Sequence, residues 1–257
     1  MSNGQRSRGG MGGHARNTRW ALAAALLLVG GAVHASPPVR SPQPPPPRQN
    51  TMTAPPHSRF DLSGTQLTDA GLVLWLAQQP DPSQPVLLTL DSNQLTRARI
   101  DALAAASLHF LTALSASHNP IGDEGLRVIA TGTLFESVEN LALADTGITA
   151  AGAQVVIGPD SVYGLSSLDL SGNPLGDAGV EAIAASPYGS YLRTLNLNEV
   201  GATDRAARAL ASSPHLADLG YLEFKGNTLT DDGLAALRAS PHLASCTIET
   251  GEAPPAQ

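Results

Sequence analysis

The stretch Leu168-Asp-Leu-Ser-Gly-Asn173-Pro-Leu-Gly-Asp-Ala-Gly179 decides the fold, because variants of it recur along the chain. Seven copies align on the position of Asn173, which we call the ladder slot. The slots hold Thr65, Asn93, Asn119, Thr146, Asn173, Val200 and Asn227, spaced 28, 26, 27, 27, 27 and 27 residues apart. A fixed period in this range predicts a solenoid of stacked units rather than a globule around one buried pocket.

Each copy has the pattern of a short strand, a turn and a helix. Leucines or equivalents precede the slot by eight, five and three residues, and the last two alternate as a strand does. An apolar residue two positions after the slot anchors the turn by burial. A carboxylate four positions after the slot precedes an Ala/Leu-rich stretch, where it favours helix initiation by capping N–H groups and by facing the helix dipole. These carboxylates are Asp69, Asp123, Asp177, Asp204 and Asp231.

The pattern L-x-x-L-x-L-x-x-N-x-L followed by a helix resembles the leucine-rich repeat, and its length is similar to that of the ribonuclease-inhibitor-like subclass. The sequences of residues 179–183 and 233–237 also resemble bacterial GALA-type repeats. The resemblance covers residues 59–251. It implies an α/β solenoid of about seven repeats plus a partial C-terminal repeat, with parallel strands on the concave face and helices on the convex face. It implies no reaction.

In that family the slot asparagine hydrogen-bonds backbone groups of its own and neighbouring repeats. The resemblance therefore implies a structural ladder made of Asn93, Asn119, Asn173 and Asn227. Val200 cannot form such bonds, and its repeat also has Ala202 and Ala206 where Leu and Gly are usual. We therefore expect the sixth repeat to be a weak point. Drift in a redundant array is the simpler origin of these departures, and a binding insertion is the alternative.

The N-terminal segment has the three-part layout of a secretory signal. Its basic part precedes the apolar run 20–29, and Val33 and Ala35 are small residues at the positions that a signal peptidase reads. This predicts a signal peptide over residues 1–35, cleaved after Ala35, and an exported protein, periplasmic or secreted. Retention as a membrane anchor is the alternative, because the uncharged run 20–39 is just long enough to span a bilayer. A third interpretation takes the Gly/Arg-rich start as a nucleic-acid-binding arm.

Residues 36–58 are rich in proline and predict an extended, disordered spacer without a core. An SH3 ligand is the alternative, although the arginines do not stand at the usual offsets from a P-x-x-P core. Residues 252–257 are expected to form a disordered tail.

The net charge of the chain is −7, and the first 35 residues hold four arginines and no acid, so the rest carries 11 basic and 22 acidic residues and a charge of −11. Because affinity for nucleic acid depends on basic contacts, we expect no nucleic-acid partner. The preference for Arg over Lys and the many alanines are consistent with a bacterial source. The single cysteine, Cys246, occupies a strand position and is expected to be a core residue.

Catalytic motifs are not evident, and neither a cofactor nor a metal is expected. His215 and His242 recur 27 residues apart in links between helix and strand, but two histidines without a carboxylate are not a metal site. His118 lies in a turn and the sequence suggests no partner for it. The sequence therefore indicates a protein that is not an enzyme, and a hydrolase with an unrecognised site is the alternative.

Strand alternation predicts which side chains point outward from the strands. The first five repeats place small or bland residues there, whereas the last two place amides, an aromatic ring and charges. Such side chains are typical of interface hot spots. We therefore expect an exported, non-enzymatic protein-binding module, with a secreted bacterial effector that binds a host protein as the alternative. The candidate binding residues are Asp169, Asn196, Asn198, Tyr221 and Glu223.

Overall fold

The computed structural model describes residues 58–66, 68–77, 85–105, 111–130, 137–158 and 164–251. All of them belong to one compact unit, Pro42–Gln257. The predicted signal peptide 1–35, the proline-rich segment up to residue 57 and the tail 252–257 lie outside the described residues.

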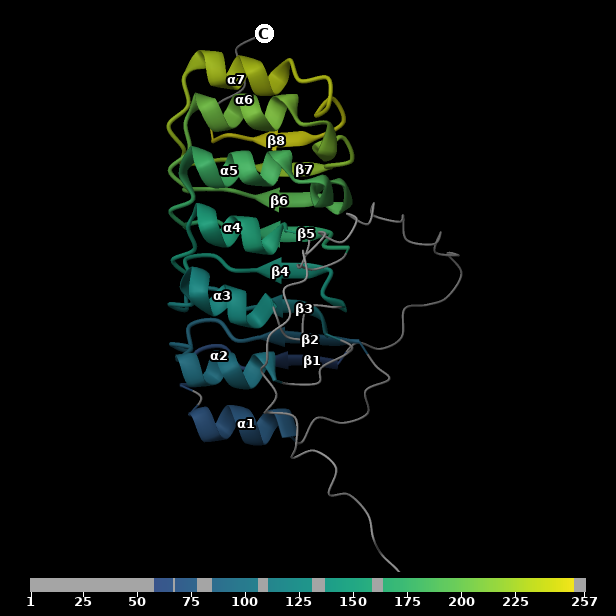
Figure 1. Ribbon diagram of the computed structural model, residues 1–257. Helices are drawn as coiled ribbons and strands as arrows, with labels where there is room; N and C mark the ends of the chain where they lie inside the picture. The colour runs from purple at the N-terminus through teal and green to yellow at the C-terminus, as the bar shows by residue number, and fades with distance from the viewer. Residues whose placement is uncertain are drawn as a thin grey trace, which may run out of the picture. The chain divides into compact units, whose positions relative to one another are not determined.

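Strands and helices alternate along the described chain (Figure 1). The strands are β1 (Ser58–Asp61), β2 (Val86–Thr89), β3 (Leu111–Ser115), β4 (Asn140–Ala142), β5 (Ser167–Asp169), β6 (Thr194–Asn196), β7 (Tyr221–Glu223) and β8 (Thr247–Glu249). The helices are α1 (Asp69–Ala77), α2 (Arg97–Ala104), α3 (Gly122–Ala130), α4 (Ala150–Val156), α5 (Gly176–Ala185), α6 (Asp204–Ser212) and α7 (Asp231–Arg238). Two short 3-10 helices, η2 (Pro187–Tyr191) and η3 (Pro214–Leu216), lie in the links after α5 and α6.

The eight strands form one parallel sheet in the order of the chain, β1 to β8. Equivalent positions of successive repeats lie side by side, as Leu168, Leu195 and Leu222 do. The helices form a second layer in which each packs against the next (Figure 1). This arrangement confirms the predicted α/β solenoid, with β8 as the strand of the partial last repeat. We call the side of the sheet away from the helices the strand face.

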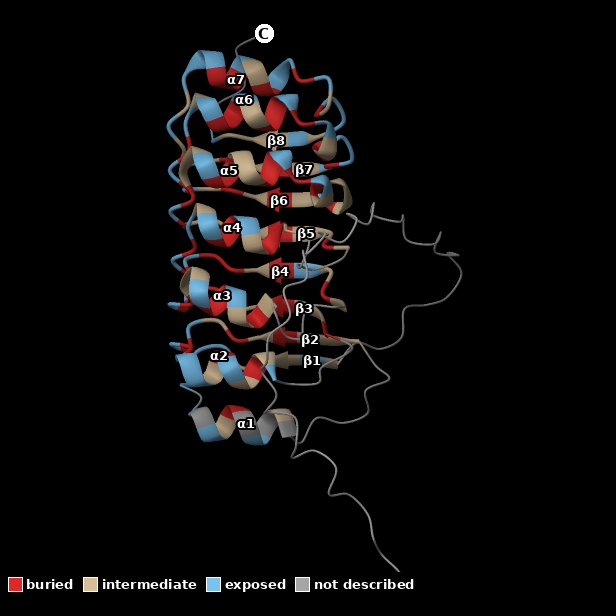
Figure 2. Ribbon diagram, in the orientation of Figure 1, coloured by how far each residue is buried: buried red, intermediate tan, exposed pale blue. Residues whose placement is uncertain are grey.

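The core lies between the two layers and runs through successive repeats. Leu168 and Leu170 of the fifth repeat are buried, and so are Leu195 and Leu197 of the sixth. Figure 2 shows buried residues in strands and helices alike along the stack. The fold is therefore stabilised mainly by apolar contact between neighbouring repeats, as in other solenoids.

In the first six repeats the chain turns from strand to helix in two ways, and proline decides between them. The residue before the slot is left-handed in every repeat, from φ 52° at Asp145 to φ 69° at Gly226. A second left-handed residue follows the slot in four repeats, for example Gly147 at φ 75°. Repeats three and five have proline there, which fixes φ near −65°. In those two the second left-handed residue is displaced to Gly122 and Gly176.

The helix caps differ from the prediction. Thr149, Thr203 and Thr230 cap their helices through their own hydroxyl groups. The aspartates instead connect neighbouring repeats: the Asp123 carboxylate accepts from the Thr149 amide at 2.7 Å and from its hydroxyl at 2.5 Å. The same links join Asp177 to Thr203 and Asp204 to Thr230.

For Asp123, Asp177 and Asp204 the prediction of a cap on their own helix is therefore wrong, although all three do lie in the first helical turn, where the dipole favours them. The hydrogen bond from the Thr230 hydroxyl lowers the pKa of Asp204 below its usual value. A Cβ at Gly152 or Gly233 would overlap with the carboxylate of the preceding repeat, which explains the glycines there.

Candidate functional site

The ladder asparagines lie inside the strand-to-helix turns and join consecutive repeats. The Asn173 side-chain nitrogen donates to Leu143 O at 2.7 Å in the preceding repeat and to Leu170 O at 3.0 Å in its own. Its Oδ1 accepts from the backbone amides of Thr146 and Ile148 at 3.0 Å each. The same pattern recurs at Asn119 and Asn227, and the Asn93 side-chain nitrogen makes the same donations.

These bonds show that the effect of Val200 falls on a different repeat from the one expected. The amide of Val200 is itself bonded to Asn227 Oδ1 at 3.1 Å, and the Val200 side chain is fully buried. A slot asparagine accepts hydrogen bonds from two backbone amides of the preceding repeat, as Asn173 does. Val200 has no side-chain acceptor, so it is the fifth repeat that lacks these two bonds. There the Leu175 amide donates to Asn173 O at 2.8 Å within its own turn. The turn at Leu175 thus compensates locally.

A second ladder, which the sequence analysis missed, lies at the helix-to-strand links. The buried Ser186, Ser213 and Ser240 each donate through Oγ to a carbonyl at the end of the helix in the preceding repeat, at 2.5–2.6 Å. The available signal was the serine before proline that recurs every 27 residues. The last repeats are therefore connected both after the strands, by the asparagines, and before the strands, by the serines.

Four of the five candidate binding residues form one hydrogen-bonded group on the strand face. The Asn198 side-chain nitrogen donates to Glu223 Oε2 at 2.6 Å, and Asn198 Oδ1 accepts from the Lys225 amide at 2.6 Å. Asn196 Oδ1 accepts from the Asn198 amide at 3.0 Å. We call Asn196, Asn198, Tyr221, Glu223, Lys225 and Glu249 the C-terminal cluster.

Glu249 completes this cluster from the last strand. Its carboxylate pairs with the Lys225 ammonium group, and both side chains are half-buried. It also accepts a hydrogen bond from Tyr221, which raises the pKa of the phenol from 10.0 to about 12. The Lys225 and Tyr221 hydrogen bonds lower the pKa of the Glu249 carboxyl. The sequence analysis did not select Glu249, although it stands next to Glu223 in register and follows it by one repeat.

Asp169, the fifth candidate, lies beside the cluster without joining its hydrogen bonds. It is next to Asn196 in register. Its Oδ1 accepts instead from the amide and hydroxyl of Ser171 at 2.9 and 2.7 Å. The carboxylates of Asp61 and Asp91 likewise accept hydrogen bonds from serine residues. The hydrogen bond from the Ser63 hydroxyl lowers the pKa of Asp61.

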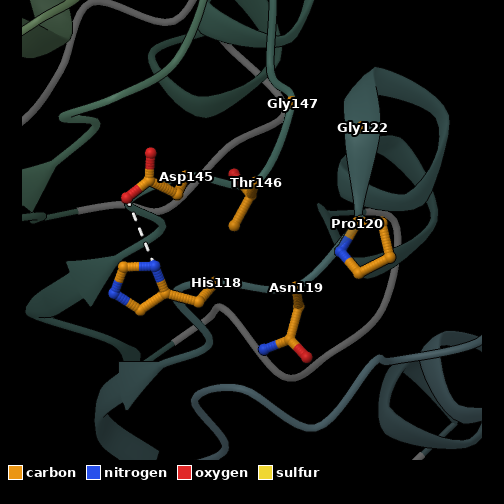
Figure 3. A pocket seen from close by; sticks show the side chains of 7 residues that line it. All are labelled: His118, Asn119, Pro120, Gly122, Asp145, Thr146 and Gly147. Atoms are coloured by element: carbon orange, nitrogen blue, oxygen red, sulfur yellow. Dashed lines mark ion pairs between the residues drawn. The ribbon is translucent and has the colours of Figure 1, made fainter.

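A shallow hollow at the turn edge contains an ion pair that the sequence did not suggest. His118 Nδ1 lies 3.2 Å from Asp145 Oδ2, and both side chains are exposed. Figure 3 shows the two side chains pointing toward one another from neighbouring turns, with Asn119 and Thr146 beside them. The prediction that His118 has no partner is therefore wrong.

The described residues hold no group of three or more His, Cys, Asp or Glu side chains that could bind a metal ion. His215 and His242 lie half-buried in the links, as expected. Cys246 is half-buried rather than fully in the core, and its burial raises the pKa of the thiol. None of the helices in the described residues has both the length and the apolar character needed to cross a membrane.

Comparisons with known proteins agree with this geometry. A family model described as "Leucine Rich repeat" matches residues 107–130, 165–184 and 215–237. The chain contains leucine-rich repeats. It is 36% identical over 125 residues to a ribonuclease inhibitor of Sus scrofa, and 31% identical over 129 residues to one of Mus musculus. The matches cover 46% and 48% of this chain but only 27% and 28% of those relatives, so the matched part corresponds to about a quarter of their length.

Proposed function

We propose that this protein is a protein-binding module whose partner docks on the C-terminal cluster. The observation that carries the proposal is the connected network of Asn198, Glu223, Lys225, Glu249 and Tyr221 across strands β6, β7 and β8. Side chains that are already held in place lose little conformational entropy when a partner binds. Tyrosine is also enriched among the residues that contribute most to binding energy at protein interfaces.

The chemistry of this surface favours a partner with basic groups. Asp169, Glu223 and Glu249 lie in one row of the sheet, together with Asn196. Neighbouring strands are about 4.8 Å apart, so these side chains offer oxygen acceptors at short intervals. Lys225 is already paired with Glu249. A partner that presents lysine or arginine side chains would therefore meet acceptors rather than a competing cation.

Both of these relatives are named as inhibitors of ribonuclease. This supports a ribonuclease as one protein to test, without assigning it, because the matched region is only part of those longer proteins. An acidic surface is a poor ligand for nucleic acid itself. We therefore propose a protein partner and no nucleic-acid partner.

We further propose that the protein is exported and not an enzyme. The export proposal rests on the basic, apolar and small-residue layout of residues 1–35. N-terminal sequencing of protein from its native host tests it: a terminus near Ser36 is expected, an uncleaved membrane-bound chain would favour the anchor, and an intact Met1 on soluble cytoplasmic protein would contradict export.

The proposal of no enzymatic activity rests on the strand face, where the carboxylates lie on an open sheet rather than enclosed in a pocket. A hydrolase screen of the protein tests this, and turnover of any substrate that disappears on loss of a strand-face carboxylate would contradict it. A secreted bacterial effector stays the alternative biological role.

Cross-linking capture of proteins from the native environment tests the binding function. The wild-type chain should retain a specific protein, and Tyr221→Ala combined with Glu223→Gln should lose it. Ser63→Ala, at the opposite end of the strand face, is the matched control and should retain it. Capture that is unchanged by the cluster variant would place the interface elsewhere.

A further inference from the structure

The two end helices of the stack differ in the character of their outer sides. Helix α7 ends the stack with Asp231, Asp232 and Arg238, all exposed. The sequence of α1, Asp-Ala-Gly-Leu-Val-Leu-Trp-Leu-Ala, has only apolar residues after its first position. End units of a solenoid need a polar outer side, because no further repeat covers them. Helix α7 meets this condition and α1 does not.

Helix α1 has a described helix on one side only. It packs against α2, and Figure 1 shows no described helix beyond it. Within α1, Leu72 is fully buried and Leu76 is half-buried, whereas Leu74 is 59% exposed. Leu74 is the one large apolar side chain that is exposed among the described residues. Because α1 is an end helix without a polar outer side, we expect it to be covered.

We propose that residues 42–57 of the same chain cover α1, with the run Pro44–Pro47 lying along its outer side. The sequence analysis treated this segment as a spacer; the inference gives it a structural role as an N-terminal cap. It stands apart from the proposed binding function, which lies at the other end of the sheet.

The lengths of the two segments match. A helix of nine residues such as α1 is about 13 Å long at 1.5 Å per residue. Four prolines in a polyproline II helix extend about 12 Å at 3.1 Å per residue. The ten residues 48–57 connect the proline run to β1, which belongs to the same repeat as α1. They can span roughly 30 Å, more than twice the length of α1.

The composition of the segment also fits an apolar helix. Proline rings are apolar, and a polyproline II segment is ordered before it docks, so that little conformational entropy is lost. Residues 42–57 contain no acidic side chain, whereas the repeats are strongly acidic. The covalent connection gives the segment an effective concentration of about millimolar, which favours it over a second copy of the chain at ordinary protein concentrations.

Hydrogen exchange of the full-length chain tests the cap. Changing Pro44, Pro45, Pro46 and Pro47 to Ser should raise exchange of the α1 amides about tenfold or more and leave α7 unchanged. The matched control changes Pro254 and Pro255 of the C-terminal tail to Ser and should leave α1 as in the wild type. In the Leu74→Ser background the four proline substitutions should have no further effect, because the contact is already lost. Unchanged protection of α1 in the four-proline variant would overturn the proposal.

Photocrosslinking provides a readout that does not depend on variant stability. A photoreactive side chain at Gln43 of the full-length chain should crosslink within the chain to residues 69–77. Crosslinks between two copies, with α1 protection that depends on protein concentration, would assign the cover to a second copy and overturn the proposal. Crosslinks to other repeats would overturn it as well.

Discussion

The two ends of the strand face have the same backbone register but use their carboxylates differently. Near the N-terminal end, Asp61 accepts from the amide and hydroxyl of Ser63, so its carboxylate orders the exit of its own strand. Near the C-terminal end, Asn196 performs that backbone role by accepting from the Asn198 amide. Glu223 is then available for a side-chain contact with Asn198 in the neighbouring strand.

The fold therefore provides equivalent positions at both ends, and the side chains at those positions determine what the surface can offer a partner. Serine and aspartate at these positions satisfy local backbone groups and leave a surface with little to offer a partner. Amides, a tyrosine and longer carboxylates at the equivalent positions form a network that spans three strands. Function on a solenoid is therefore set by exposed positions rather than by the repeat itself.

The largest expected effect tests whether the two regions share one core. Leu114 in β3 and Leu222 in β7 are both buried at the same position of their repeats. Leu114→Ala and Leu222→Ala should each lower the free energy of unfolding by about 2–5 kcal/mol, because each leaves a cavity. Denaturant titration measures both. A cost near zero at either site would show that this region is not packed like the rest.

The asparagine ladder should matter in both regions, but less at the C-terminal end. Asn173→Ala removes buried hydrogen bonds to backbone groups and should cost roughly 1–3 kcal/mol. Asn227 is half-buried and its bonds to Phe224 O and Lys225 O are longer, so Asn227→Ala should cost less. Denaturant titration of the two variants compares them, and a larger loss at Asn227 would contradict this ranking.

The contribution of the serine ladder to stability can be measured with two adjacent residues in the C-terminal repeats. Ser213 is buried and bonds Ala184 O of the preceding repeat, whereas Ser212 is exposed and bonds within its own helix. Ser213→Ala should lower the free energy of unfolding by about 1 kcal/mol, and Ser212→Ala should be close to neutral. Thermal unfolding of both variants measures the difference. Equal values would show that the second ladder contributes nothing.

The smallest effect concerns the phenol in the cluster. The hydrogen bond to Glu249 raises the pKa of Tyr221 to about 12, from 10.0. Because the folded-state pKa is raised, this contribution to stability is fully present below pH 10 and is lost as the pH rises toward about 12. Ultraviolet titration of tyrosinate should show a late-ionising phenol that Tyr221→Phe removes. A Phe variant with an unchanged titration curve would contradict the contact.

The sequence predicted the repeat boundaries, the parallel strands and the outward positions, because a 27-residue period fixes which residues become neighbours. It also indicated that Asn173 lies inside its turn. The hydrogen bonds between Asp123 and Thr149 were missed. They depend on the position of the first turn of one helix relative to the first turn of the helix in the next repeat, which the sequence does not give. Glu249 was missed for a similar reason: its role comes from Tyr221 and Lys225, which only the stacking of the last partial repeat brings close.

The affinity of the captured partner for paired variants of the full-length chain tests the central claim most directly. Tyr221→Ala combined with Asn196→Ala should weaken binding by about 2 kcal/mol or more, roughly thirtyfold in Kd, because these residues belong to the C-terminal cluster. Ser115→Ala, in the row of Asn196 but three strands away, should leave the Kd nearly unchanged. Equal and small effects of both variants would contradict the account and move the interface away from the C-terminal end of the strand face.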